Sequence, residues 1–368
     1  MNGARPVPFP PVAGPLLDWY DRNKRAMPWR DRPDPYRVWV SEIMLQQTRV
    51  EAVIPYFERF LTAFPDVAEL AAAPLEQVLK SWEGLGYYSR ARHLHQAARV
   101  VVERHGGQLP ADAAALLQLP GIGLYTAGAI ASIAFGQPEP AVDGNVLRVT
   151  ARLTADATEI GTTGFAKQVA DRIRPQIPHD RPGDFTQALM ELGACVCLPG
   201  VAARCPICPL AHLCLAHHNG NPEDYPVRKA ARVRKVEVRT AFVIATPDGI
   251  LLRRRPERGL LAGLWEFPHI EGRLDEEEAR KAAVSWGAAV SRLCALPGRT
   301  HVFTHLEWHL SGWLVCASSS DVPVDWVLAT EAELRDKYPL PTAFMPWLNL
   351  LGGCGMMGAS ESDGRQDP

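Results

Sequence analysis

The sequence lacks a long hydrophobic run. None of its 368 residues lies in an uninterrupted apolar segment of the ~20 residues that a membrane-spanning helix needs. The first 15 residues carry five prolines and no apolar stretch of signal-peptide length. We therefore expect a cytoplasmic protein that does not associate with membranes.

An excess of charge of either sign is also missing. Lys and Arg number 39 against 41 Asp and Glu, so the net charge of −2 indicates no polyanionic partner, and any basic binding surface must be local. Residues 228–239 are such a segment, with six basic residues against Glu237 alone, a local charge of +5. We expect an exposed linker that runs into an edge strand, and its charge either contacts phosphate or is simply solvated.

Cysteine is scarce outside one cluster. Five of the eight cysteines lie between residues 195 and 214, and a reducing compartment favours metal binding over a disulfide framework. Spacing alone does not separate a four-cysteine zinc site from an iron–sulfur cluster. The candidate ligands follow the pattern Cys-x7-Cys-x2-Cys-x5-Cys and are Cys197, Cys205, Cys208 and Cys214.

Hydrophobic periodicity divides the chain into two fold classes. Residues 15–217 have the i, i+3, i+4, i+7 pattern of amphipathic helices, clearest at 36–44, 50–63, 90–105 and 124–135. From residue 236 the sequence becomes β-rich, with an Asp-Gly hairpin turn at 248–249. Strands are expected at 236–246, 249–255, 301–317 and 325–330, with helices near 275–286 and 329–337. The sequence thus predicts an all-α domain followed by a smaller α+β domain.

Two features of the helical half suggest chemistry. The turn Leu-Pro-Gly-Ile-Gly-Leu-Tyr at 119–125 has Gly121 and Gly123, whose backbone N–H groups can bind a phosphate at a helix start, although a plain helix–turn–helix connection uses the same residues. Two carboxylates, Glu42 and Asp143, lie near helix starts, where they can be a solvated dipole partner and an N-cap. These two residues alone do not show whether the carboxylates act together in catalysis.

Several separate motifs resemble one family, the helix–hairpin–helix DNA glycosylases, and within it the MutY-type adenine DNA glycosylases. The resemblance covers about residues 15 to 350. It rests on WRDRPDPYRVWVSEIMLQQTRV at 29–50, GLGYYSRARHL at 84–94, LPGIGLYTAGAI at 119–130, VDGNVLRV at 142–149, the cysteine cluster and Phe-Thr-His at 303–305.

The resemblance assigns roles to the two carboxylates. Cleaving the bond between adenine and deoxyribose leaves positive character on the sugar, so one acid should protonate the base and one carboxylate should stabilise the cation. We expect Glu42, with its pKa raised by burial, to be the acid and later to activate water, and Asp143 to stabilise the sugar. Tyr125 and Asn145 should orient them. Tyr125 stands where strand-cleaving relatives place a lysine, so strong lyase activity is not expected.

The family also implies residues that bind DNA. An extruded adenine needs a pocket and a wedge that fills the gap, and Gly121 and Gly123 would hold phosphate. The expected pocket and wedge residues are Trp29, Arg30, Leu45, Gln46, Gln47, Thr48, Leu85, Tyr87 and Gln187.

The C-terminal half resembles the Nudix-like module that reads 8-oxoguanine in this family. Phe303, Thr304 and His305 stand where the usual motif is Phe-Ser-His, and Thr304 keeps the hydroxyl. A Nudix pyrophosphatase needs a Glu-rich metal box, and the acidic run at 275–278 lacks its spacing. We therefore expect a reading domain and no second hydrolase.

These expectations define an organisation. We expect a glycosylase domain at 8–217 with its metal loop at 195–214, a basic linker at 218–236, a Nudix-like domain at 237–351 and a disordered tail at 352–368. The resemblance implies one 4Fe–4S cluster per chain, although the family usually has six residues between its first two ligands and this chain has seven. It also implies a monomer that acts in a bacterial-type cytoplasm on duplex DNA with an A:8-oxoguanine or A:G mispair.

Two other functions stay open. A bifunctional glycosylase–lyase for oxidised pyrimidines shares the fold, but Tyr125 and the additional C-terminal domain disfavour it. A helix–hairpin–helix iron–sulfur protein that only binds DNA is disfavoured because both Glu42 and Asp143 are present.

Overall fold

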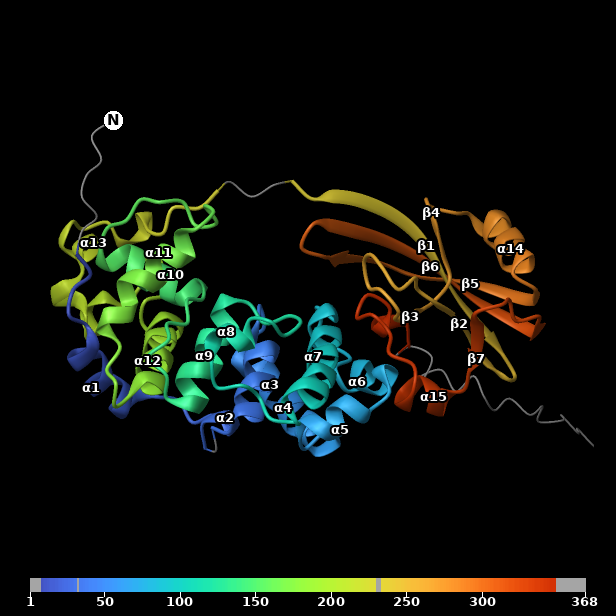
Figure 1. Cartoon of the computed structure of the whole chain (residues 1–368). Coiled ribbons are helices and arrows are strands. Elements are labelled where there is room, and N and C mark those ends of the chain that lie inside the picture. The colour runs from blue at the N-terminus through green and yellow to red at the C-terminus, as the bar shows by residue number, and fades with distance from the viewer. Residues whose placement is uncertain (1–7, 32, 230–232, 349–368) are drawn as a thin grey trace, which may run out of the picture. The chain divides into compact units, whose positions relative to one another are not determined.

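The structure, a computed structural model, describes residues 8–31, 33–229 and 233–348. The chain forms two compact units (Figure 1). The helical unit holds the chain up to residue 73 and residues 89–231, and the sheet unit holds residues 74–88 and the chain from 232 onward. The predicted tail at 352–368 and residues 230–232 of the predicted linker lie outside the described residues.

Helices make up the helical unit, as predicted, and the four periodic segments correspond to α3, α4, α7 and α9. The helices are α1 (Ala13–Asn23), α2 (Pro28–Asp31), α3 (Pro35–Leu45), α4 (Val50–Ala63), α5 (Val67–Ala72), α7 (Ser89–His105), α8 (Ala113–Leu116), α9 (Leu124–Phe135), α10 (Gly144–Leu153), α11 (Phe165–Ile173), α12 (Pro182–Cys195) and α13 (Leu215–His218). Short 3-10 turns are η1 (Arg174–Gln176), η2 (Gly200–Ala202), η3 (Cys205–Ile207), η4 (Ala211–Leu213) and η5 (Pro222–Asp224).

Local sequence determines where α3 and α10, the helices that carry Glu42 and follow Asp143, begin. Asp34 caps α3 by accepting from the Arg37 N–H at 3.1 Å. Asp143 caps α10 by accepting from the Val146 N–H at 2.7 Å. A shared core of α1, α10, α11 and α12 then holds the unit together, and it includes Leu16, Val149, Phe165, Phe185 and Leu189.

The sheet unit is built on one mixed sheet with the order β3-β2-β1-β6-β5, while β4 pairs with β1 and β7 with β2. β1 and β6 are parallel, with Ala241 opposite Gly312, and β5 and β6 form a long antiparallel hairpin. The elements are α6 (Leu75–Ser81), β1 (Lys235–Thr246), β2 (Gly249–Arg254), β3 (Trp265–Glu266), β4 (His269–Glu271), α14 (Glu276–Ser285), β5 (Ala288–Val302), β6 (Leu306–Ser320), β7 (Trp326–Ala329) and α15 (Glu331–Asp336).

The prediction of an edge strand after the basic segment is wrong. β1 lies inside the sheet, between β6 on one side and β2 and β4 on the other. The reason is in its apolar half: Ala241 and Val243 face one core, while Phe242 and Ile244 face the core under α14. A strand with apolar residues on both faces is buried on both faces.

The segment 74–88 packs with the sheet unit although it comes from the first third of the chain. Lys80 Nζ donates to the carbonyl oxygens of Leu334 at 2.8 Å and Tyr338 at 3.2 Å. Glu83 Oε1 accepts from the Leu340 N–H at 2.7 Å, and Lys80 and Glu83 form an ion pair at 2.6 Å.

In the part of the chain that the structure describes, no one helix has the length and apolar character to cross a membrane; a sharply bent pair, Pro182–Cys195 with Gly200–Ile207, meets the criteria of length and composition only when joined.

Candidate active site and cysteine site

The glycine turn before α9 brings Tyr125 to the start of a helix. Gly121 has φ +76°, and a Cβ there would lie 2.5 Å from the Cβ of His93, so only glycine fits. Gly123 is the extended N-cap residue of α9, with open space around its Cα. The turn therefore leaves the first N–H groups of α9 available for a phosphate and places Tyr125 in the first turn.

Glu42 is a buried acid held by Tyr125. It lies on α3 with its residue 5% exposed, so the interpretation as a solvated dipole partner is wrong. The Tyr125 hydroxyl donates a short hydrogen bond to Glu42 Oε2 and also lies 3.8 Å from Met190 Sδ. Among the described residues no hydrogen bond reaches the other oxygen, Oε1, which is therefore the oxygen that can carry a transferable proton.

Asp143 is both an N-cap and a second acid. Its Oδ1 accepts the Val146 N–H, and its Oδ2 accepts from Asn145 Nδ2 at 2.7 Å. Burial raises the pKa of Asp143 above its ordinary value, and the hydrogen bonds of Val146 and Asn145 and the charge of Arg148 offset this only in part. These donors favour the charged form, as a cation-stabilising carboxylate requires.

The two acids differ in environment, and the charge of Asp143 acts on Glu42. Burial raises the pKa of Glu42 to about 7, the Tyr125 hydrogen bond lowers it, the charge of Asp143 raises it and Arg30 lowers it. The effect of the Asp143 charge on Glu42 places the two acids within electrostatic reach of one another. Glu42 keeps a proton near neutral pH, whereas Asp143 is surrounded by hydrogen-bond donors.

A second polar network joins α2 to α12. Glu191, 2% exposed, accepts from Arg25 Nε at 2.7 Å and from Arg30 Nη2 at 3.0 Å. Arg30 Nε donates to Gln187 Oε1 at 2.9 Å, which orients that amide. Trp29, beside Arg30 on α2, is buried against Phe57. The predicted residues Trp29, Arg30 and Gln187 are therefore brought into one region.

The segment after α3 is shaped by an arginine that sequence reasoning missed. Buried Arg90 donates through Nη1 to the carbonyl oxygens of Ile43, Met44 and Gln46 at 2.6–3.0 Å, and through Nη2 to Thr48 Oγ1 at 3.2 Å. It satisfies the carbonyls at the end of α3. The predicted residues here, half-buried Leu45, Gln46 and Thr48 and exposed Gln47 with φ +56°, follow directly after Glu42 on the chain. No pattern in the sequence around Arg90 indicates that its side chain binds the carbonyl oxygens at the end of α3.

The four predicted cysteine ligands line one small cavity. Cys197, Cys205, Cys208 and Cys214 surround it together with Arg152, whereas Cys195 points to Glu191 Oε1 at 3.8 Å. Burial raises the pKa of Cys208 to about 12 and also raises that of Cys214, so a bound cationic group would be needed to hold these two as thiolates.

Helix α10 connects the two sites. Arg148 Nη2 donates to Asn145 Oδ1 at 2.8 Å, and Arg148 Nε donates to the Cys197 carbonyl at 2.7 Å. One turn further, Arg152 Nη1 lies 3.3 Å from Cys197 Sγ. Sequence reasoning missed both arginines, because the Cys197 groups that they contact lie 45 to 49 positions away along the chain.

The sheet unit carries the remaining predicted residues. Leu85 is buried and Tyr87 is 45% exposed with φ +49°. Phe303, Thr304 and His305 form the turn between β5 and β6, and Thr304 Oγ1 donates to the Tyr87 hydroxyl at 3.4 Å. The acidic run at 275–278 forms the capping box of α14, in which Asp275 and Glu278 bond to each other's backbone N–H, so its acids start a helix.

Comparisons with known proteins identify the class. The model of HhH-GPD superfamily base excision DNA repair proteins matches residues 40–175, and that of the NUDIX domain matches residues 240–350. A thermostable thymine-DNA glycosylase of known structure is similar with a TM-score of 0.50 and 28% identity, over 56% of this chain and 95% of that one. The fold and the site thus define a helix–hairpin–helix base excision repair protein with a Nudix-like second domain.

Curated relatives name the family more closely. The adenine DNA glycosylase of Homo sapiens is 39% identical over an alignment of 355 positions that covers 80% of this chain and 65% of that protein. The adenine DNA glycosylase of Buchnera aphidicola is 33% identical over 301 residues, 82% of this chain and 85% of that protein. The chain belongs to the adenine DNA glycosylase family.

Proposed function

We propose that this protein hydrolyses the N-glycosidic bond of adenine mispaired with 8-oxoguanine or guanine in duplex DNA. One observation carries the proposal: a buried Glu42, with its pKa near 7 and one oxygen held by Tyr125, lies within electrostatic reach of an Asp143 that donors surround. This division between a proton-bearing acid and a charge-stabilising carboxylate is what glycosidic cleavage needs.

The reaction follows from these roles. Glu42 donates its proton to a ring nitrogen of the extruded adenine, the glycosidic bond breaks and its electron pair leaves with the base. Asp143, held by Val146 and Asn145, stabilises the cationic sugar. Glu42, now a carboxylate, takes a proton from the water that attacks the sugar carbon. The products are adenine and an abasic site, and Glu42 is again protonated.

Tyr125 supports a hydrolase without an efficient lyase step. Its hydroxyl holds Glu42 and offers no amine to form a Schiff base with the sugar. Borohydride treatment during turnover should therefore trap little covalent protein–DNA adduct. Efficient trapping would favour the bifunctional alternative.

We place the recognition of the opposite base in the sheet unit. The turn at residues 303–305, named here the reading turn, exposes Thr304 and His305 beside Tyr87, so a candidate wedge and a candidate reader lie together. Gln46, Gln47 and Thr48 supply the second wedge segment, Leu45, Trp29, Arg30 and Gln187 surround the adenine, and the N–H groups around Gly121 and Gly123 hold a phosphate.

We further propose that Cys197, Cys205, Cys208 and Cys214 hold one 4Fe–4S cluster. Four thiols around one cavity, beside the guanidinium of Arg152, fit a cofactor with sulfur ligands. When bound, the cluster would be structural, holding the loop from 197 to 214 in shape. Iron and acid-labile sulfide should bind to the wild-type chain and to Cys195→Ser and be lost in Cys197→Ser, whereas zinc without sulfide would contradict the assignment.

A panel of duplexes tests the activity. Release of adenine from A:8-oxoguanine and A:G duplexes, with none from A:T or thymine-glycol duplexes, is expected of a monomer acting in the cytoplasm. Cleavage of the thymine-glycol duplex would support the bifunctional alternative. Tight binding without release of any base would support a protein that only binds DNA.

A further inference from the structure

The reading turn rests on a single buried tryptophan. Trp308, 1% exposed on β6, meets Phe303 edge-on with ring centroids 4.9 Å apart at 74°. The Phe303 N–H donates to the Leu306 carbonyl at 2.8 Å, which closes the turn, and Phe303 also meets His301 at 4.6 Å. Phe303 is therefore the half-buried base of the turn, and its ring packs against the rings of Trp308 and His301.

Trp308 is itself held from several sides. Its Nε1–H donates to Glu237 Oε2 at 3.1 Å, and the same oxygen accepts from Arg239 Nη2 at 2.7 Å. The guanidinium of Arg239 lies 5.1 Å from the indole centroid and that of Arg255 5.8 Å, while the ring of His269 lies 5.6 Å away. These contacts together hold the indole ring of Trp308 in one orientation.

The layer beneath is rigid because it is fully paired. Glu266, 1% exposed, accepts from Arg253 at 2.7 Å and from His269 at 3.0 Å, and it also bonds Arg255. Arg239 in turn contacts His269 Nδ1 at 3.3 Å. Arg239 also donates to Glu237, which accepts the Trp308 N–H, so this network holds the indole through Arg239 and Glu237.

We infer that Trp308 is a positioning residue for the reading turn, and that through Phe303 it sets how strongly the protein prefers 8-oxoguanine to guanine opposite adenine. The inference rests on the proposed function, because only a turn that reads the opposite base has a preference to set. Trp308 touches neither Thr304 nor His305 in any contact found among the described residues, so it acts through Phe303.

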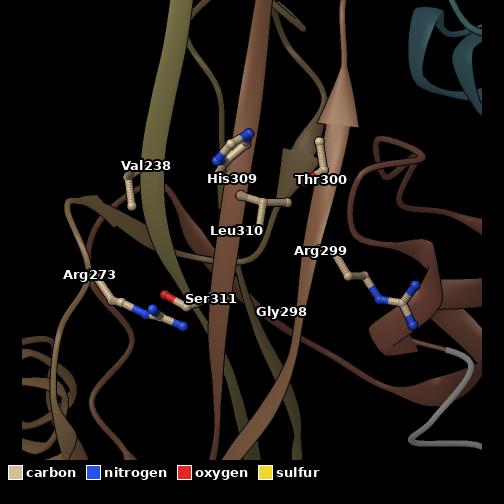
Figure 2. Close-up of a pocket in the computed structure, with 8 residues that line it drawn as sticks. All are labelled: Val238, Arg273, Gly298, Arg299, Thr300, His309, Leu310 and Ser311. Atoms are coloured by element: carbon tan, nitrogen blue, oxygen red, sulfur yellow. The ribbon is translucent and has the colours of Figure 1, made fainter.

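The opposite face of β6 supplies a matched control. Trp313 lies five positions along the same strand in the other core, and its Nε1–H donates to the Leu274 carbonyl at 3.4 Å. This side of the sheet also has a pocket of about 370 Å³, where His309 and Ser311 lie beside Val238 and Thr300 (Figure 2). Trp308 belongs to the core that contains Leu310 and Phe344, whereas Trp313 packs against the core under α14, so the two faces of β6 can be changed separately.

The test uses the full chain and the ratio of two rates. Single-turnover release of adenine is measured from A:8-oxoguanine and A:G duplexes. Trp308→Phe should lower the ratio of the two rates by about threefold to tenfold, the range that a well-placed aromatic pair accounts for. Trp313→Phe should leave the ratio at the wild-type value. Glu237→Ala should lower the ratio, and Glu237→Gln should retain most of it, because an amide oxygen still accepts the indole N–H.

Each other outcome overturns the inference in a recognisable way. A wild-type ratio in Trp308→Phe and Glu237→Ala, or an equal loss in Trp313→Phe, shows that the turn is set elsewhere. If both rates fall together with the melting temperature, Trp308 is merely structural. If Trp308→Phe does not fold, the comparison of Glu237→Ala with Glu237→Gln tests the inference by itself. A wild-type chain that releases no adenine refutes the proposed function itself. A wild-type ratio near one overturns only the inference about Trp308, because the protein then has no preference to set.

Discussion

Glu42 in the helical unit and Glu266 in the sheet unit are both almost fully buried, yet their pKa values move in opposite directions. Burial raises the pKa of Glu42 to about 7, and the hydrogen bond of Tyr125 does not offset it. Its surroundings add another acid, Asp143, whose charge raises the pKa further.

The surroundings of Glu266 are cationic. Burial raises its pKa as well, but the hydrogen bond of His269 and the charges of His269, Arg255 and Arg253 lower it to about 2. Burial makes an isolated charge costly in both places, and the neighbours decide whether the group keeps its proton or its charge. The helical unit thus holds an acid, and the sheet unit holds an ion pair.

Replacing Glu42 gives the largest expected effect. Glu42→Gln keeps the shape and a partner for Tyr125 but cannot donate the proton, so single-turnover release of adenine should fall by about 10²- to 10⁴-fold with duplex affinity retained. Glu103→Gln, on the exposed side of α7, is the control. Unchanged release in Glu42→Gln would remove the acid from the mechanism.

Replacing Glu266 should affect stability and leave the chemistry intact. Glu266→Gln leaves Arg253 and Arg255 without their buried partner, which should cost about 3–5 kcal/mol in urea unfolding of the full chain. Because the folded pKa is depressed from 4.5 to about 2, this stabilisation is present above about 4.5 and is lost as the pH falls towards 2. If Glu42→Gln lowered the free energy of unfolding as much as Glu266→Gln, the contrast between a protonated acid and a buried ion pair would be wrong.

The pH dependence of adenine release follows from the sign of the Glu42 shift. Glu42 is protonated below its pKa of about 7, so the rate should fall about tenfold per pH unit above that value. Tyr125→Phe removes a hydrogen bond that lowers this pKa, so its alkaline limb should lie at higher pH. If the alkaline limb of the Tyr125→Phe profile moved to lower pH, the Tyr125 hydroxyl would favour the protonated form of Glu42.

The smallest effect concerns the segment 74–88. Glu83 accepts the Leu340 N–H and pairs with Lys80 in a half-buried site, so Glu83→Ala should lower the free energy of unfolding by about 1 kcal/mol. Glu76→Ala, which breaks only the exposed pair with Arg254 on the same segment, should change it by less than about 0.5 kcal/mol. Equal effects would mean that the segment gains little from packing on the sheet unit.

Some of this architecture follows from local sequence. The periodic helices α3, α4, α7 and α9 were predictable, because each depends on neighbouring residues. The hairpin predicted at 248–249 also forms, but its turn residues are 247 and 248, and Gly249 begins β2 opposite Thr246. β5 was not, since Pro297 and Gly298 interrupt its alternation and the structure accommodates them with a register shift between Leu296 and Arg299. The membership of 74–88 in the sheet unit also escaped prediction, because its partners lie more than 250 positions away.

The sequence by itself determined which residues could act: the carboxylates of Glu42 and Asp143, a glycine turn that presents Tyr125, and four cysteines at a metal-binding spacing. Each is a local feature that the order of residues imposes. Only the tertiary structure decided that Glu42 keeps a proton, that Cys197 and not Cys195 faces the cavity, and that Trp308 supports the reading turn. Those properties depend on burial and on the charges of groups distant along the chain, which are set when the helices and the sheet pack.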